Sequence, residues 1–182
     1  MPDLSKQPRR TLTWEELCRD PNLHDLPFKI ETNDRGQIVM SPRLGYITKR
    51  RERSEQVPLG CFYQSDLVTL MNEHLPQGRT AVEFAVRTAK GTKVADVAWL
   101  SPARAEEAEG TYDTPVAPEI CVEVLSPTNT PEEIEDKTQL YFEAGAEEVW
   151  TCDADGRLRF FDPEGERETP RRAPDFPHEL DD

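Results

Sequence analysis

The sequence has no apolar run close to the roughly 20 residues that a membrane-spanning helix requires. The basic residues near its N-terminus are not followed by an apolar stretch, so we expect no secretory signal. Both absences predict a cytoplasmic protein that does not contact a membrane.

Sulfur and imidazole chemistry have little support in the sequence. The four cysteines are widely scattered, with no Cys-x-x-Cys pair, and the three histidines lack the spacing of zinc ligands. We interpret the cysteines as reduced thiols, as expected in the cytoplasm. A hydrolase with a nucleophilic Ser or Cys is disfavoured, because no Gly-x-Ser-x-Gly motif or Cys/His arrangement is present.

Positive charge is scarce, and the formal net charge of the 182 residues is −14. Residues 1–100 carry 15 basic and 13 acidic residues, whereas residues 101–182 carry 7 and 23. An acidic chain is a poor non-specific binder of phosphate backbones, so nucleic-acid contacts would need a local basic patch. One patch is present, although an exposed, solvated segment explains it equally well: Arg43, Lys49, Arg50, Arg51 and Arg53.

Periodicity and capping signals alternate between strand and helix along the chain. This order predicts an α/β (mixed α+β) domain over residues 11–165, with a disordered tail at 1–10 and a polar tail at 166–182. Helices are expected near 14–19, 62–75 and 130–144, and strands within 28–32, 37–41, 81–88, 93–101, 119–126, 147–152 and 157–162.

Two of the predicted strands contain a carboxylate among apolar residues. Glu123 interrupts Ile-Cys-Val-Glu-Val, and Asp96 shares a strand face with apolar neighbours. An unpaired carboxylate costs several kcal/mol to bury, so each acid needs a cation, a metal or a functional cleft. Two such acids on adjacent strands could share a divalent ion, and oxygen ligands favour Mg²⁺ or Mn²⁺.

Lys137 lies on the apolar stripe of the predicted helix 130–144, so it could add a positive charge near the same place. The alternative is an exposed lysine that pairs with Glu133 one turn earlier. The residues alone leave both interpretations open.

Several motifs together resemble the Uma-two family of predicted endonucleases, within the PD-(D/E)XK, restriction-endonuclease-like superfamily. They are EVLSP (123–127), a helix with Lys137, Tyr-x-x-Ala-Gly (141–145), and a strand with Trp150. The segments KIETNDRGQIVMSP and KVADVAWLS resemble the family's early hairpin and its aspartate strand. The resemblance covers residues 11–165.

The resemblance implies a central mixed β-sheet flanked by helices and a metal-dependent phosphodiesterase site. Asp96 and Glu123 would bind Mg²⁺ or Mn²⁺ together with the backbone carbonyl of Val124, and Glu31 would help to hold the ion or its water. Lys137 would replace the superfamily lysine, which normally lies two residues after the glutamate, where this chain has Leu125.

Two functions are therefore considered from the sequence. The first is a Mg²⁺-dependent endonuclease that acts on nucleic acid, with DNA as the expected substrate. The second is a nuclease-fold module for binding or assembly with little or no catalysis, which the acidic net charge favours. Exposed strand edges make a homodimer plausible but do not establish it.

Overall fold

The computed structural model describes residues 11–24, 26, 28–42, 59–126 and 129–180. Its elements are a mixture of helices and strands, as the sequence predicts. The helices are α1 (Trp14–Arg19), α2 (Pro21–His24), α3 (Leu59–His74), α4 (Pro102–Ala108) and α5 (Pro131–Glu143). The strands are β1 (Phe28–Thr32), β2 (Ile38–Pro42), β3 (Arg79–Thr88), β4 (Gly91–Leu100), β5 (Ile120–Val124), β6 (Glu148–Cys152), β7 (Leu158–Asp162) and β8 (Gly165–Arg167).

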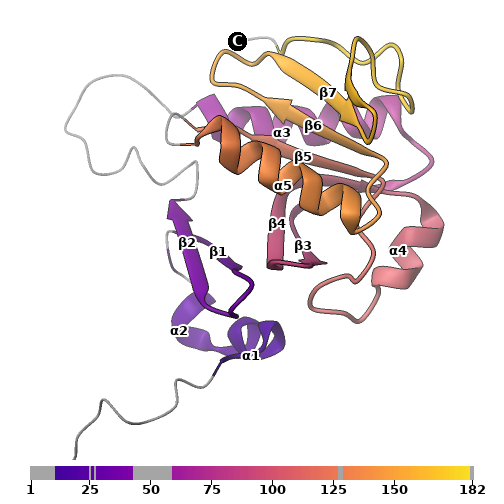
Figure 1. The fold of residues 1–182 in the computed structure, drawn as a ribbon. Helices are drawn as coiled ribbons and strands as arrows, with labels where there is room; N and C mark the ends of the chain where they lie inside the picture. The colour runs from indigo at the N-terminus through magenta and orange to yellow at the C-terminus, as the bar shows by residue number, and fades with distance from the viewer. Residues whose placement is uncertain (1–10, 25, 27, 43–58, 127–128, 181–182) are drawn as a thin grey trace, which may run out of the picture.

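A six-stranded mixed sheet, in the order β3-β4-β5-β6-β7-β8, forms the centre of the protein (Figure 1). Its neighbouring strands are antiparallel except β5 and β6, which are parallel and are connected through α5. A separate hairpin of β1 and β2 contacts β4. The predicted mixed α+β fold, with a central sheet flanked by helices, is confirmed.

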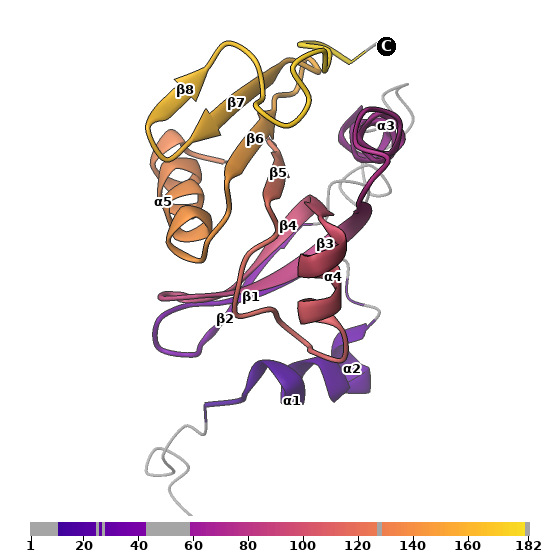
Figure 2. The same ribbon diagram turned by 90° about the vertical axis from the view of Figure 1, so that its right-hand side faces the viewer.

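The sheet lies between α3 on one face and α5 on the other (Figure 2). On the α3 side, Leu67 and Met71 are completely buried and pack in one core with Trp150. On the α5 side, Tyr141 packs with Cys121 in a second core. All five residues of β5 are buried, because helices cover both faces of this central strand.

The start of α5 has the predicted capping box. The hydroxyl of Thr130 accepts from the Glu133 N–H, the Glu133 carboxylate accepts from the Thr130 N–H, and Pro131 occupies the first helical position. Gly145 follows the helix with φ of 99°, a left-handed backbone that glycine adopts readily. These signals fix where α5 begins and ends, and therefore which turn carries Lys137.

Residues 166–180 differ from the expected polar tail. β8 pairs with β7, and Ala173, Phe176 and Leu180 are buried in the core on the α3 side. Each of these apolar residues stands alone in the sequence among prolines and charged residues, so no periodic pattern predicts their burial. The backbone N–H groups of Arg171 and Arg172 also donate to the Glu148 carboxylate, at 3.1 and 3.0 Å.

Two sequence predictions lie outside the described residues. The proposed tail at 1–10 is one, and the basic patch from Arg43 to Arg53 is the other. Within the described part of the chain, every helix is too short or too polar to serve as a membrane span.

Candidate metal centre

Three strands and one helix bring six polar side chains together. β1 supplies Lys29 and Glu31, which share one face because they are two residues apart in a strand. β4 supplies Asp96 and β5 supplies Glu123, while α5 contributes a lysine and a tyrosine one turn apart. We call these residues the charged cluster: Lys29, Glu31, Asp96, Glu123, Lys137 and Tyr141.

Asp96 and Glu123 lie on either side of one ammonium group. Lys29 Nζ is 2.8 Å from Asp96 Oδ1 and 3.4 Å from Glu123 Oε2. The two acids that the sequence predicts as metal ligands therefore point at the same place. They come from adjacent strands, as expected from their positions in the sheet.

Lys137 contacts the same group of acids instead of pairing at the surface. Its Nζ lies 2.9 Å from Glu123 Oε2, 2.8 Å from Glu31 Oε1 and 3.2 Å from the Val94 carbonyl oxygen. An ammonium has three protons, so these three acceptors satisfy it. The alternative pairing with Glu133 is not adopted, since that carboxylate accepts from the Thr130 N–H in the capping box.

The contacts form an alternating row of charges: Asp96, Lys29, Glu123, Lys137 and Glu31. Three carboxylates and two ammonium groups give the row a formal net charge of −1. The exposed fractions of these side chains are only 7–15%, so solvent screens the charges poorly. Buried ion pairs seldom stabilise a fold more than apolar residues would, so this cluster is better explained by a function than by stability.

Backbone and hydroxyl donors hold the three carboxylates in place. Asp96 Oδ2 accepts from the Val124 N–H at 2.9 Å, and Glu31 Oε1 accepts from the Val94 N–H at 2.9 Å. Tyr141 donates its hydroxyl proton to Glu123 Oε1 at 2.7 Å. Each of the two predicted ligands thus keeps one oxygen fixed by a neutral donor and turns the other toward Lys29.

The protonation states follow from burial and from the neighbouring charges. Burial by itself lowers the pKa of Lys29, but the carboxylates of Glu123, Asp96 and Glu31 outweigh it and raise the pKa well above the usual value. Burial, followed by the charge of Glu123, raises the pKa of Tyr141. Lys29 therefore stays a cation, and Tyr141 stays a neutral hydrogen-bond donor.

The donor set fits a hard divalent cation, provided that Lys29 is not between the acids. Asp96 Oδ1 and Glu123 Oε2 are oxygen ligands aimed at one point, and Mg²⁺ commonly binds one or two carboxylates while it keeps several waters. Across the described ranges, no three His, Cys, Asp or Glu side chains are grouped to hold a metal ion. Any further ligands would therefore be water or backbone, and the backbone of Val124 lies beside Asp96.

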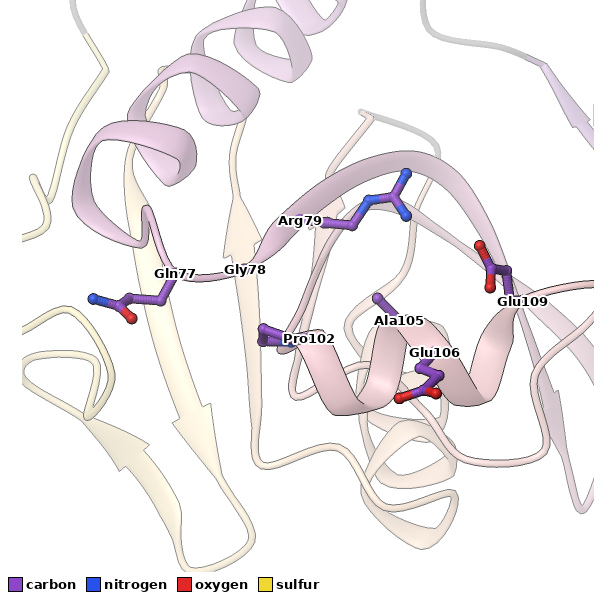
Figure 3. Close-up of a pocket in the computed structure, with 7 residues that line it drawn as sticks. All are labelled: Gln77, Gly78, Arg79, Pro102, Ala105, Glu106 and Glu109. Carbon is purple, nitrogen blue, oxygen red and sulfur yellow. The ribbon is translucent and has the colours of Figure 1, made fainter.

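Two surface cavities differ in their relation to the charged cluster. The larger, about 340 Å³, lies between the α3–β3 connection and α4 (Figure 3) and contains none of the cluster residues. It is lined by Gln77, Gly78, Arg79, Pro102, Ala105, Glu106 and Glu109. The second, about 290 Å³, is lined by Lys29, Glu83 and Val94 together with residues of α1, α2 and β1, so it adjoins the cluster.

Sequence reasoning named four of the six cluster residues and missed Lys29 and Tyr141 as members of the site. A lysine in a short hairpin strand resembles an ordinary exposed residue, but its i, i+2 spacing from Glu31 places both on one face. Tyr141 is one turn after Lys137 on the same helical stripe, which was the available signal. Lys93 is nearby, yet its ammonium donates to the Thr32 carbonyl oxygen at 2.9 Å.

The fold resembles that of a protein of known structure. A crystal structure described as "a putative nuclease belonging to DUF820", from Anabaena variabilis ATCC 29413, matches with a TM-score of 0.64 and 17% sequence identity. The match covers 89% of this chain and 91% of that chain. At this identity the likeness supports the fold alone.

Sequence comparison identifies the family. No match to a curated protein was found. The profile of the Uma2 family, described as "Putative restriction endonuclease", matches residues 60–180, which is more than half of the chain and includes Asp96, Glu123 and Lys137. On this evidence the protein belongs to the Uma2 family of restriction-endonuclease-like proteins.

Proposed function

We propose that this protein is a Mg²⁺- or Mn²⁺-dependent endonuclease that hydrolyses phosphodiester bonds in DNA. One observation carries the proposal: Asp96 and Glu123, on adjacent strands, aim one oxygen each at a single cation position beside Lys137. Family membership supports a nuclease, whereas the metal and the DNA substrate are part of the proposal.

Asp96 and Glu123 would hold the ion, with the backbone carbonyl of Val124 as a further oxygen donor. When bound, the ion supplies a Lewis acid that neutralises charge on the scissile phosphate and lowers the pKa of the attacking water. Tyr141 keeps Glu123 oriented through the hydrogen bond to its other oxygen. Such orienting partners commonly change metal affinity or activity by about 10- to 100-fold.

Lys137 and Glu31 would act on the substrate side of the site. In hydrolysis the water oxygen bonds to phosphorus and an ester P–O bond breaks. The water gives up a proton to a base or to the solvent, and the departing alkoxide oxygen takes up a proton from the solvent. The Lys137 ammonium can donate to a phosphate oxygen and stabilise the negative charge that develops there. Glu31, 2.8 Å from Lys137, orients this ammonium and offers an acceptor for the water proton.

A second candidate is a nuclease-fold module for binding or assembly with little or no catalysis. The formal net charge of −14 favours this candidate, because it opposes contact with a phosphate backbone. The cytoplasmic location and the homodimer remain predictions from the sequence under either function.

The test is a cleavage assay with duplex DNA and with RNA of the same sequence, in Mg²⁺, in Mn²⁺ and in EDTA. We expect metal-dependent DNA cleavage that falls by about 100-fold or more in Glu123→Gln and in Lys137→Met. Glu166→Gln is the matched control, because Glu166 pairs with Arg159 away from the cluster and the variant should keep wild-type activity.

Two results would reject the catalytic proposal. Equal activity in the wild type and in both cluster variants would identify a contaminating nuclease. An inactive wild type that still binds DNA in a mobility-shift assay would favour the binding module.

A further inference from the structure

Lys29 occupies the place that the proposed ion requires. Its Nζ contacts Asp96 Oδ1 at 2.8 Å and Glu123 Oε2 at 3.4 Å, and these are the oxygens that face the cation position. The remaining oxygens of both acids are engaged by Val124 and Tyr141. An ion that used Asp96 Oδ1 and Glu123 Oε2 would therefore meet the Lys29 ammonium, and it would share Glu123 Oε2 with Lys137, which lies 2.9 Å away.

Charge balance, like the geometry, indicates that Lys29 and a divalent ion do not occupy the cluster together. With Lys29 in place, the row of three carboxylates and two ammonium groups has a net charge of −1, and a divalent ion would make it +1. With Lys29 moved away, the row is −2, which one divalent ion neutralises. Because the cluster is largely shielded from solvent, a surplus positive charge is costly there.

The structure also provides a place for the displaced side chain. Lys29 lines the cavity of about 290 Å³ that adjoins the cluster, and Glu83 lines the same cavity. Glu83 lies on β3 opposite Asp96, where the strand ladder is interrupted, and its φ of 49° is in the left-handed region. Such strained backbone is concentrated at functional sites. A carboxylate is thus present on the wall of the cavity into which the ammonium could turn.

We propose that Lys29 is a built-in cation that closes the metal position between Asp96 and Glu123, and that a divalent ion binds only when this ammonium moves away. The inference rests on the proposed function, because it concerns the same metal centre. It makes metal binding a competition: the apparent Kd of the ion equals its intrinsic Kd divided by the fraction of molecules in which the position is open.

The test is direct measurement of Mn²⁺ affinity by calorimetry on the full chain, without substrate. Lys29→Met keeps the aliphatic stem and removes the competing charge, so we expect Mn²⁺ to bind about tenfold more tightly or better. Lys90→Met is the matched control: it makes the same change in net charge at an exposed lysine that pairs with Asp136, and its affinity should equal that of the wild type.

A second measurement uses the wild-type protein and does not depend on the variant being stable. The protein is treated with an amine-reactive acetylating reagent, with and without Mn²⁺. Mass spectrometry then quantifies the acetylation of each lysine. We expect labelling of Lys29 to rise several-fold when Mn²⁺ is added, while labelling of the exposed Lys90 stays constant.

The outcomes separate this inference from the proposed function. Mn²⁺ binding that is equal or weaker in Lys29→Met overturns the inference alone, as does Lys29 labelling that Mn²⁺ leaves unchanged. If Lys29→Met does not fold, the labelling result decides. An absence of Mn²⁺ binding in the wild type and in Lys29→Met overturns the inference and the metal-dependent function together.

Discussion

Two groups of carboxylates along the sheet, each with a buried member, are neutralised differently. On β7 and its turn, Asp162 and Glu164 contact the guanidinium groups of Arg167 and Arg171, so two negative charges meet two positive ones. In the charged cluster, three carboxylates meet only two ammonium groups. The first group is balanced, whereas the second retains a negative charge that a cation could satisfy.

The choice of cation differs as well. Arg167 and Arg171 are 37% and 56% exposed and reach inward to the fully buried Asp162 side chain. A guanidinium is planar and holds a carboxylate in a defined geometry, whereas the lysine ammonium is a compact point charge on a flexible stem. Lys29 is therefore suited to leave its partners, and the arginines are suited to hold β8 and the following segment in place. The comparison separates an ion cluster suited to a structural role from one suited to the proposed metal site.

The largest expected contrast comes from making one substitution in each group. Asp96→Asn should abolish Mn²⁺ binding and lower nuclease activity by about 100-fold or more, because it removes a proposed metal ligand. Asp162→Asn should leave both properties unchanged, because the polar partners of Asp162 within the described residues are Arg167, Arg171 and the turn backbone, away from the charged cluster. Calorimetry and a cleavage assay on the two folded variants check this. Equal loss of Mn²⁺ binding in both variants would contradict the distinction between the charged cluster and the arginine group.

A smaller effect is expected from Tyr141→Phe, which removes the hydroxyl that donates to Glu123 Oε1 and keeps the buried ring. Loss of such a partner should weaken Mn²⁺ binding or activity by about tenfold, since Glu123 is then less firmly oriented. The matched control is Tyr112→Phe, because the Tyr112 hydroxyl accepts from Arg19 on α1 at 3.1 Å. If Tyr141→Phe binds Mn²⁺ with the affinity of the wild type, Tyr141 does not contribute to metal binding.

The smallest expected effect concerns stability at the arginine group. Asp162→Asn should lower the Tm by roughly 5 °C at neutral pH, since it leaves Arg167 and Arg171 without their buried partner. Asp136→Asn, at the exposed pair with Lys90, should change the Tm little. Thermal unfolding followed by circular dichroism measures both variants. An equal Tm for the wild type and Asp162→Asn would show that this group does not stabilise the fold.

The same pair of proteins gives a pH test. Burial by itself raises the pKa of Asp162, but the hydrogen bond from Arg167 and the neighbouring positive charges lower it below its ordinary value. A lowered pKa in the folded state contributes stability that is complete above the ordinary pKa and is lost as pH falls through the folded pKa. The Tm difference between the wild type and Asp162→Asn should therefore shrink below about pH 4. A difference that grows in acid would contradict this.

The sequence predicts the fold well where local signals are strong and poorly where packing decides. The capping box at Thr130 and Glu133 fixed the start of α5, and the apolar run around Glu123 identified the buried central strand. Phe176 and Leu180 were missed, because single apolar residues among prolines and charges acquire their positions only from contacts with distant elements.

The site divides in the same way. Asp96 and Glu123 were recognisable, because a carboxylate inside an apolar strand is conspicuous, and the family resemblance added Glu31. Lys29 was missed although it shares a strand face with Glu31, since its contacts depend on how the β1–β2 hairpin packs against β4, and that packing has no local signature in the sequence. The choice between the two possible partners of Lys137 likewise required three-dimensional contacts.

The most direct measurement is a crystal structure of the protein soaked with Mn²⁺, in which anomalous scattering locates the ion. We expect one ion at about 2.1 Å from Asp96 Oδ1 and from Glu123 Oε2, with the Lys29 ammonium turned toward the adjoining cavity. An ion bound away from these two carboxylates, or no ion at all with Lys29 still between them, would contradict the assignment of the charged cluster as a metal centre.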